Sequence, residues 1–197
     1  EADYWKILKD DFLIVSIWGI VSDTFKLIGK PILTVNQLLN SLDDRIWQLY
    51  ADGITCTLNQ VDSDYATSLM KRYKVRSAGE LSQFTAAVRP SFDAWRDDFI
   101  ERRPFTTGSR HLDEVLSETR GMITFQETLM TYFQWLGVTP AESIGLIKKI
   151  SKKKIHPEDF EALENRLREK WVENTGSIEY FDMTWQMVQG CMSYGFA

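Results

Sequence analysis

Apolar residues recur every three or four positions along most of the chain, which is the spacing of one face of an α-helix. The segment 125–136 places Phe125, Leu129 and Phe133 on such a face, and Gly137 follows as a stop signal. The pattern therefore predicts a helix that ends near residue 136.

Residues that favour helix starts precede four further apolar stripes. Ser77 and Glu80 have the spacing of a capping box, in which each side chain satisfies a backbone N–H of the first turn. Pro140 suits a first helical position because it has no N–H to leave unpaired. Asp62 or Ser63 can cap the first of the four. The predicted helices cover about 62–73, 77–88, 140–151 and 157–174.

Strand signals are weak. The segments YWKILK (4–9) and ITCTLN (54–59) alternate polar and apolar residues, but each is short. The most apolar stretch, FLIVSIWGIV (12–21), is too short to span a bilayer, and we expect it to be a buried element. The whole pattern predicts a mainly α, compact protein in one piece, without repeats or flexible linkers.

Composition agrees with this prediction. The chain has 197 residues, of which 44% are hydrophobic and 26% charged, as in an ordinary globular protein. Cys56 and Cys191 lie far apart without a His or Cys companion, which argues against a disulfide framework or a zinc site and suits a reducing compartment. The first residues do not resemble a secretory signal, so we expect a cytoplasmic protein, and the missing initial Met suggests processing or a piece of something larger.

The formal net charge is −5, but the basic residues are concentrated in the segments 71–76, 102–110 and 148–154. A local field of one sign steers ligands even when the whole chain carries the opposite charge. The overall acidity therefore does not exclude binding of a polyanion.

The segment KKISKKK (148–154) holds five lysines in seven positions. On a helix, Lys148 and Lys152 share one face, and Lys149 and Lys153 lie beside them at the same spacing. One or two cations complement the negative end of a helix dipole, whereas five without interleaved acids repel one another unless an anion joins them. Two interpretations stay open, a solvated helix end and a phosphate-binding surface.

Six segments occur in the same order as motifs of one known family. They are KDDFL (9–13), DDRIWQLYADGITCTLNQVDS (43–63), LMKRYKVRSAGELSQFTAAVRPS (69–91), HLDEVLSETRGMITFQETLM (111–130), LIKKISKKK (146–154) and SYGFA (193–197). Together they resemble the bacterial replicative DNA polymerase III alpha subunit, a member of the C family of DNA polymerases. The block ETRGMITFQETLM and the lysine segment, which is similar to L-R-R-A-M-G-K-K-K, are the most specific parts.

Some positions depart from the family pattern. Lysines stand where the family has arginines, Ser91 replaces a glycine, and Arg120 replaces an aromatic residue. These departures suggest a diverged member, such as one from a phage or a mobile element. The resemblance implies that residues 1–13 are the C-terminal edge of a palm domain, with a short β segment, and that 14–197 form a fingers domain truncated at its C-terminal end.

The resemblance implies the chemistry of a DNA-directed DNA polymerase, a nucleotidyltransferase that uses Mg²⁺. In two-metal catalysis, carboxylates hold the ions that activate the primer hydroxyl and clamp the triphosphate. The match to K-F-D-F-L makes Asp11 a catalytic, metal-binding carboxylate. The family's other two catalytic aspartates form a D-x-D pair upstream of this motif, and no such pair precedes Asp11 here. We therefore expect the isolated chain to be inactive and not to hold Mg²⁺ stably.

The resemblance also implies phosphate contacts. Lys148 matches the second arginine of R-R, so we expect Lys148 and its neighbour Lys149 to contact the triphosphate of the incoming nucleotide. Arg89 and Gln126 are further candidates for nucleotide binding, although Arg89 could equally be a buried arginine that organises the turn at Pro90. The candidates for contact with DNA phosphates are Lys152, Lys153 and Lys154.

Some residues are expected to serve the structure rather than a site. We expect His111 to make a structural contact, and the aromatic residues Tyr132, Phe133 and Trp135 to belong to the core. Gln126 and Glu127 are consecutive on a helix and cannot share a face, so only one of them can serve a site.

The partners implied by the resemblance are template-primer DNA, deoxynucleoside triphosphates, the rest of the polymerase chain and a sliding clamp reached through regions outside this chain. No membrane partner is expected. An alternative is a non-catalytic helical nucleic-acid-binding module, in which Asp11 has no role. A third is a helical protein-interaction domain whose lysines only face solvent.

Overall fold

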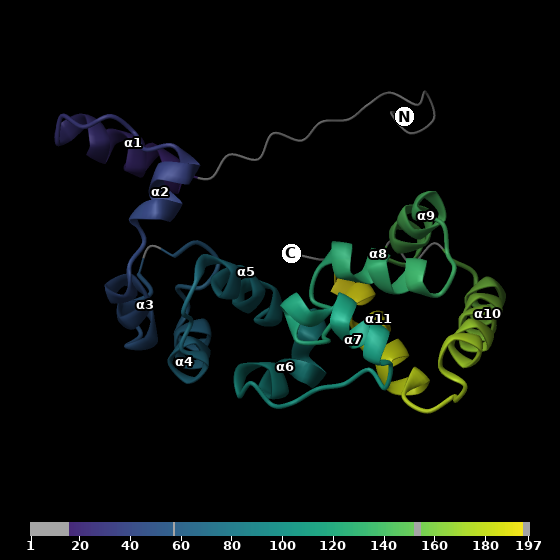
Figure 1. The fold of residues 1–197 in the computed structure, drawn as a ribbon. Helices are drawn as coiled ribbons and strands as arrows, with labels where there is room; N and C mark the ends of the chain where they lie inside the picture. Colours follow the sequence, from purple (N-terminus) through teal and green to yellow (C-terminus); the bar gives the residue numbers. More distant parts are fainter. Residues whose placement is uncertain (1–15, 57, 152–154, 195–197) are drawn as a thin grey trace, which may run out of the picture.

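The computed structural model describes residues 16–56, 58–151 and 155–194. These residues form helices and no strand (Figure 1). The α-helices are α1 (Ile17–Leu27), α2 (Val35–Ser41), α3 (Asp44–Ala51), α4 (Asp64–Tyr73), α5 (Ala78–Ala87), α6 (Asp93–Ile100), α7 (Arg110–Val115), α8 (Gln126–Trp135), α9 (Pro140–Ser151), α10 (Pro157–Thr175) and α11 (Phe181–Tyr194), and two short 3-10 turns are η1 (Pro90–Phe92) and η2 (Ser117–Thr119). The mainly α prediction is confirmed, whereas the expected N-terminal β segment lies outside the described residues.

Local signals in the sequence set the helix starts. The Ser77 hydroxyl accepts a hydrogen bond from the N–H of Glu80 at 3.1 Å, as a capping box requires. The Glu80 carboxylate accepts from the N–H of Arg76 instead of reaching back to Ser77, so only half of the box forms. Helix α9 begins at Pro140 and ends at Ser151, as predicted.

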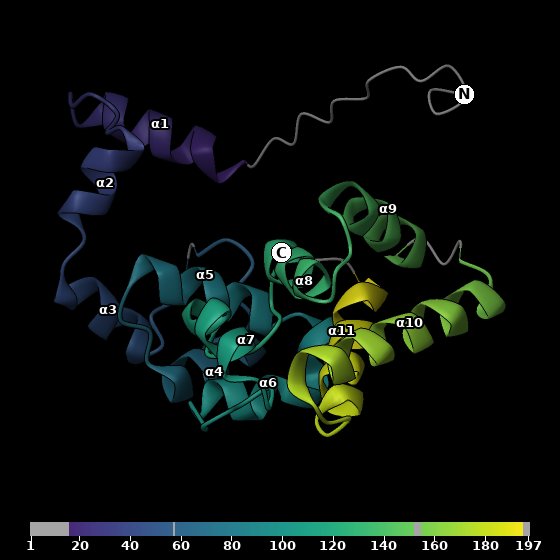
Figure 2. The same cartoon turned by 45° about the vertical axis from the view of Figure 1, so that its right-hand side comes forward.

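The helices pack into an elongated body with an arm at one end. Helix α3 packs on α4, α5 and α6 pack on each other, and α9 lies against both α8 and α11. The turn η1 lies against α11, which brings the middle of the chain to its last helix. Figures 1 and 2 both show α1 and α2 beyond α3, away from the body formed by α4 to α11.

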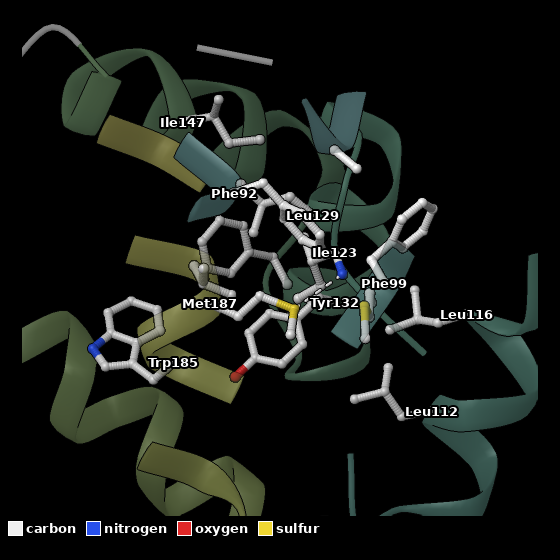
Figure 3. Packing of buried hydrophobic residues seen from close by; sticks show 14 of the residues in the cluster. Phe92, Phe99, Leu112, Leu116, Ile123, Leu129, Tyr132, Ile147, Trp185 and Met187 are labelled. Carbon is white, nitrogen blue, oxygen red and sulfur yellow. Dashed lines mark hydrogen bonds between the residues drawn. The ribbon is translucent and has the colours of Figure 1, made fainter. Parts of the chain in front are cut away.

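The core of the body is continuous and rich in aromatic rings. Trp171 of α10 is fully buried and meets Trp135 edge to face, with ring centroids 5.2 Å apart. Tyr132 and Phe133 are also fully buried, while Trp135 is partly buried against the same cluster, so their assignment to the core is confirmed. In Figure 3 the buried residues of α8 and α11 face one another around Met187.

The expectation that 12–21 is a buried element is wrong for its described part. Helix α1 contains no buried residue, and Trp18 and Ile20 are 61% and 62% exposed. The physical reason is the position of the helix, because no element of the body covers it (Figure 2). The segment 54–59 is likewise not a strand in its described residues, which form a loop and turns.

Candidate functional site

Helix α9 is held firmly against the body by one face. Ser143 and Ile147 are buried at the interface with α8 and α11, and Leu146 and Ile150 are partly buried beside them. The Ser143 hydroxyl donates to the carbonyl oxygen of Thr139 at 2.9 Å, which satisfies its buried polar group. A helix fixed along one stripe presents its other faces in a defined orientation.

The opposite side of the last turn of α9 carries Lys148 and Lys149. Both are exposed, as the spacing predicts. Neither ammonium group pairs with a carboxylate anywhere in the described part of the chain. Lys152, Lys153 and Lys154 lie outside the described residues. Lys148 and Lys149 are therefore available to bind an anion.

Lys149 also lies at an open groove between α9 and α10, with a volume of about 490 Å³. Arg166 of α10 crosses the groove to pair with Glu142 of α9 at 2.7 Å. His156 and Asp159, at the start of α10, line the same groove. The ion pair ties the two helices together, and Glu142 is thereby engaged by Arg166 rather than by the lysines.

Four of the five arginines in the segments 71–76 and 102–110 pair with acids. In Figure 1 these two segments lie between the end of α4 and the start of α7. The pairs are Arg72 with Asp97 and Glu101, Arg102 with Glu80, Arg103 with Asp98, and Arg110 with Glu114. These arginines serve the protein itself, in contrast to Lys148 and Lys149.

The pair of Arg102 and Glu80 is the best protected of them. Two guanidinium nitrogens of Arg102 donate to the two carboxylate oxygens of Glu80, each at 2.8 Å. This hydrogen bonding lowers the pKa of the Glu80 carboxyl below its usual value, although burial opposes the shift. The Arg102 guanidinium also lies 4.4 Å from the ring centroid of Tyr73. The cluster joins α4, α5 and the turn that follows α6.

The turn at Pro90 is organised by Arg96. Arg96 is 8% exposed, and its guanidinium donates to the carbonyl oxygens of Ala87 and Arg89 at 3.0 and 2.9 Å. The Arg89 side chain itself is only partly buried. A sequence signal for Arg96 did exist, because it stands at helical spacing from the apolar residues Phe92 and Phe99.

The other predicted site residues are carried by neighbouring elements. Gln126 begins α8 and is partly buried, whereas Glu127 is exposed, in line with their different faces. Arg89 directly precedes η1, which packs on α11, and α9 packs on both α8 and α11. The fold thus gathers the elements that carry Arg89, Gln126 and Lys148.

A comparison with protein families decides the identity. The model described as the bacterial DNA polymerase III alpha subunit finger domain matches residues 19–175. This chain belongs to that family. The resemblance seen in the sequence motifs is confirmed, and the alternative of a helical module without polymerase ancestry is wrong.

Bacterial polymerase subunits are among the relatives of this finger domain. The chain is 29% identical to the DNA polymerase III subunit alpha of Aquifex aeolicus, 26% to that of Caulobacter vibrioides and 24% to that of Helicobacter pylori strain 26695. Each alignment covers 96% of this chain and 16% or 17% of the relative. The chain thus spans about one sixth of the length of the relatives it matches.

The residue before the two lysines has a structural role. Ile147 is 3% exposed and packs into the core. Lys148 faces outward from the same turn. Its neighbour Lys149 supplies a further exposed charge in the same turn.

The described residues do not supply a magnesium site. No three His, Cys, Asp or Glu side chains within the described ranges come close enough to hold a metal ion. Asp11, the expected ligand, lies outside those ranges. The sequence contains a D-x-D at 62–64, but there Ser63 caps α4 by accepting from the N–H of Ala66 at 3.2 Å. The finger domain as described therefore does not fit the metal.

Across the described residues, no helix has the length and apolar character needed to cross a membrane.

His111 of α7 was expected to make a structural contact. It is exposed and makes no hydrogen bond or ion pair to another described side chain.

Proposed function

We propose that this finger domain works within a DNA-directed DNA polymerase, where the lysine-rich segment 148–154 binds phosphates. Lys148 and Lys149 contact the triphosphate of the incoming deoxynucleotide, and Lys152 to Lys154 contact phosphates of the template-primer DNA. The observation that supports this proposal is that Lys148 and Lys149 are exposed on a firmly packed helix and have no acidic partner among the described residues. In the other basic segments, by contrast, most arginines are paired with acids.

The chemistry favours such a role. Phosphoryl transfer develops charge on the triphosphate oxygens, and fixed cations stabilise that charge without reorganising during the reaction. The C-terminus of a helix carries only about half a negative charge, which two full positive charges outweigh. Lysine acts as a point charge without the bidentate fork of arginine, so contact geometry is looser than in relatives with arginine.

The remaining assignments complete the proposal. Gln126 orients the nucleotide from α8, which packs on α9, and Arg89 does so from the start of η1, which packs on α11. Residues 1–13 form the palm edge and 14–197 the fingers, and Asp11 is one carboxylate of the palm. When bound in the intact polymerase, Mg²⁺ supplies the two-metal chemistry of nucleotide addition. A sliding clamp reached through other regions of the polymerase is a further proposed partner.

The test is steady-state nucleotide incorporation by the full polymerase that contains this domain, with Lys148→Ala/Lys149→Ala. A charge-assisted hydrogen bond contributes about 1.5–3 kcal/mol, so kcat/KM for the nucleotide should fall by at least about 10-fold, and by more than about 100-fold if both contacts contribute fully. A rise in KM would indicate contact in the ground state, and a fall in kcat contact made mainly in the transition state.

The matched control is Lys71→Ala/Lys170→Ala, which removes the same charge from exposed positions on α4 and α10. The control should leave the kinetics unchanged. Equal losses in both variants would show a general charge effect, and unchanged kinetics in the α9 variant would show that its lysines only face solvent. Either result would contradict the proposal.

A further inference from the structure

Helix α9 carries an acidic residue on the same face as Lys149. Glu142 precedes Lys149 by seven positions, or two helical turns, so their Cα atoms lie about 10 Å apart along one face. Both side chains line the groove between α9 and α10. Helical side chains lean towards the N-terminus of their helix, which favours an approach of the Lys149 ammonium group to Glu142.

The two ends of α9 place opposite demands on this carboxylate. Glu142 lies in the first turn, where the partial positive charge of the helix N-terminus suits an acid. Two turns later, a free carboxylate in the groove would attract Lys149 and repel a polyanion. An acid at this position therefore works against a phosphate-binding lysine unless a cation engages it.

Arg166 of α10 supplies that cation. Its guanidinium donates to a carboxylate oxygen of Glu142 across the groove at 2.7 Å. Among the described residues, Lys149 has no ion pair, although Glu142 and Asp159 line the same groove. The ion pair therefore leaves Lys149 unpaired.

A purely structural role explains the ion pair poorly. The side chains of Arg166 and Glu142 are 47% and 39% exposed, and ion pairs at such exposure contribute little to stability. Helix α9 is already fixed against α8 and α11 through the buried residues Ser143 and Ile147. The orientation of α9 thus does not depend on Arg166.

We propose that Arg166 is a positioning residue, which holds Glu142 away from Lys149 and so keeps the Lys149 ammonium group free for phosphate. Arg166 acts through Glu142 and does not contact the nucleotide. The inference rests on the proposed function in taking Lys149 as a phosphate contact.

The first test measures the placement of Glu142 without relying on activity. A water-soluble carbodiimide joins a carboxylate to a lysine amine that lies against it, with loss of water to the reagent. Mass spectrometry of the digested full polymerase then measures the amide between Glu142 and Lys149. Its yield should rise at least about threefold in Arg166→Ala, because the carboxylate is released to Lys149. An equal yield in the two polymerases would overturn the proposal.

The second test measures nucleotide incorporation by the full polymerase. In Arg166→Ala, kcat/KM for the nucleotide should fall by about 2- to 5-fold, the range expected for competition by an exposed ion pair. The double variant Arg166→Ala/Glu142→Gln should regain the original value, because the neutral amide does not hold Lys149. In a Lys149→Ala polymerase, Arg166→Ala should cause no further loss.

Two results would assign the kinetic effect to another cause. A failure of Glu142→Gln to restore kcat/KM would show that Arg166 acts only by joining the helices, because the double variant still lacks the ion pair. The matched control Arg168→Ala removes the same charge from α10, where its partners are Glu164 and Asp182. A loss in this control equal to that in Arg166→Ala would show a general charge effect. Either result would overturn the proposal.

Failure of this inference can be told from failure of the proposed function. Unchanged kinetics in Lys148→Ala/Lys149→Ala would contradict phosphate binding by the lysines. The yield of the amide between Glu142 and Lys149 would still decide whether Arg166 holds the carboxylate away from Lys149.

Discussion

Helices α1 and α8 have similar length and a similar supply of apolar residues, yet their surroundings differ completely. Helix α8 buries Leu129, Tyr132 and Phe133, whereas α1 leaves Trp18 and Ile20 largely exposed. Both form helices because the spacing of apolar residues is a local property. Burial depends on which elements pack against a helix. Other described elements bury residues of α8, but none buries a residue of α1. The comparison shows that the local sequence determines whether a segment forms a helix, whereas the neighbouring elements determine whether that helix is buried.

The largest expected effect is in the body. Trp171→Ala removes a fully buried indole that contacts Trp135 and Phe181, so the free energy of unfolding should fall by about 3–5 kcal/mol. Denaturant unfolding of the 197-residue chain, followed by circular dichroism, measures this loss. A loss below about 1 kcal/mol would mean that the core is not packed as described.

The next effect concerns the turn at Pro90. Arg96→Leu leaves the carbonyl oxygens of Ala87 and Arg89 without their donor, and each unpaired buried group costs about 1–3 kcal/mol. The melting temperature should fall clearly. The control Arg110→Leu removes an arginine whose side chain is 94% exposed and should have almost no effect. An equal fall of the melting temperature in the two variants would contradict the role assigned to Arg96.

A smaller effect depends on pH. The pKa of Glu80 is lowered in the folded protein, chiefly by hydrogen bonding from Arg102. Its ionised form therefore stabilises the fold above the ordinary Glu pKa of about 4.3, and this contribution is lost as the pH falls from there through the lowered value. Thermal unfolding between about pH 6 and pH 3 should show a shallower loss of stability for Glu80→Gln than for the unchanged chain. An identical pH profile would contradict this account.

The smallest effect is expected in the arm. Trp18→Ala should change the free energy of unfolding of the 197-residue chain by less than about 0.5 kcal/mol, because the side chain is 61% exposed. The same denaturant titration as for Trp171→Ala measures it. A loss comparable to that of Trp171→Ala would show that α1 packs on the body after all.

Much of the fold could be predicted from the sequence because its signals are local. Ser77 and Pro140 mark helix starts wherever the helices finally lie, and α4, α5, α9 and α10 formed close to their predicted bounds. The exposure of residues 16–21 could not be predicted, because it depends on which elements pack against the segment and not on the segment itself.

The site shows the same division. The exposure of Lys148 and Lys149 followed from helical spacing, and the structure confirms it. The role of Arg96 in the turn was missed because the acceptors that fix the turn are the backbone carbonyls of Ala87 and Arg89. The apolar spacing around Arg96 indicates its burial but not these acceptors. The absence of acidic partners for the lysines is also a tertiary property, since it depends on Arg166 of α10 pairing with Glu142 of α9.

The most direct test of the central claim, that the lysine-rich segment 148–154 binds phosphates, is the salt dependence of DNA binding. The affinity of the full polymerase for primer-template duplex should be measured against salt concentration, with and without Lys152→Ala/Lys153→Ala/Lys154→Ala. Loss of three phosphate contacts predicts that the slope of log affinity against log salt becomes less steep by about 2.7. An unchanged slope in the variant would contradict the claim.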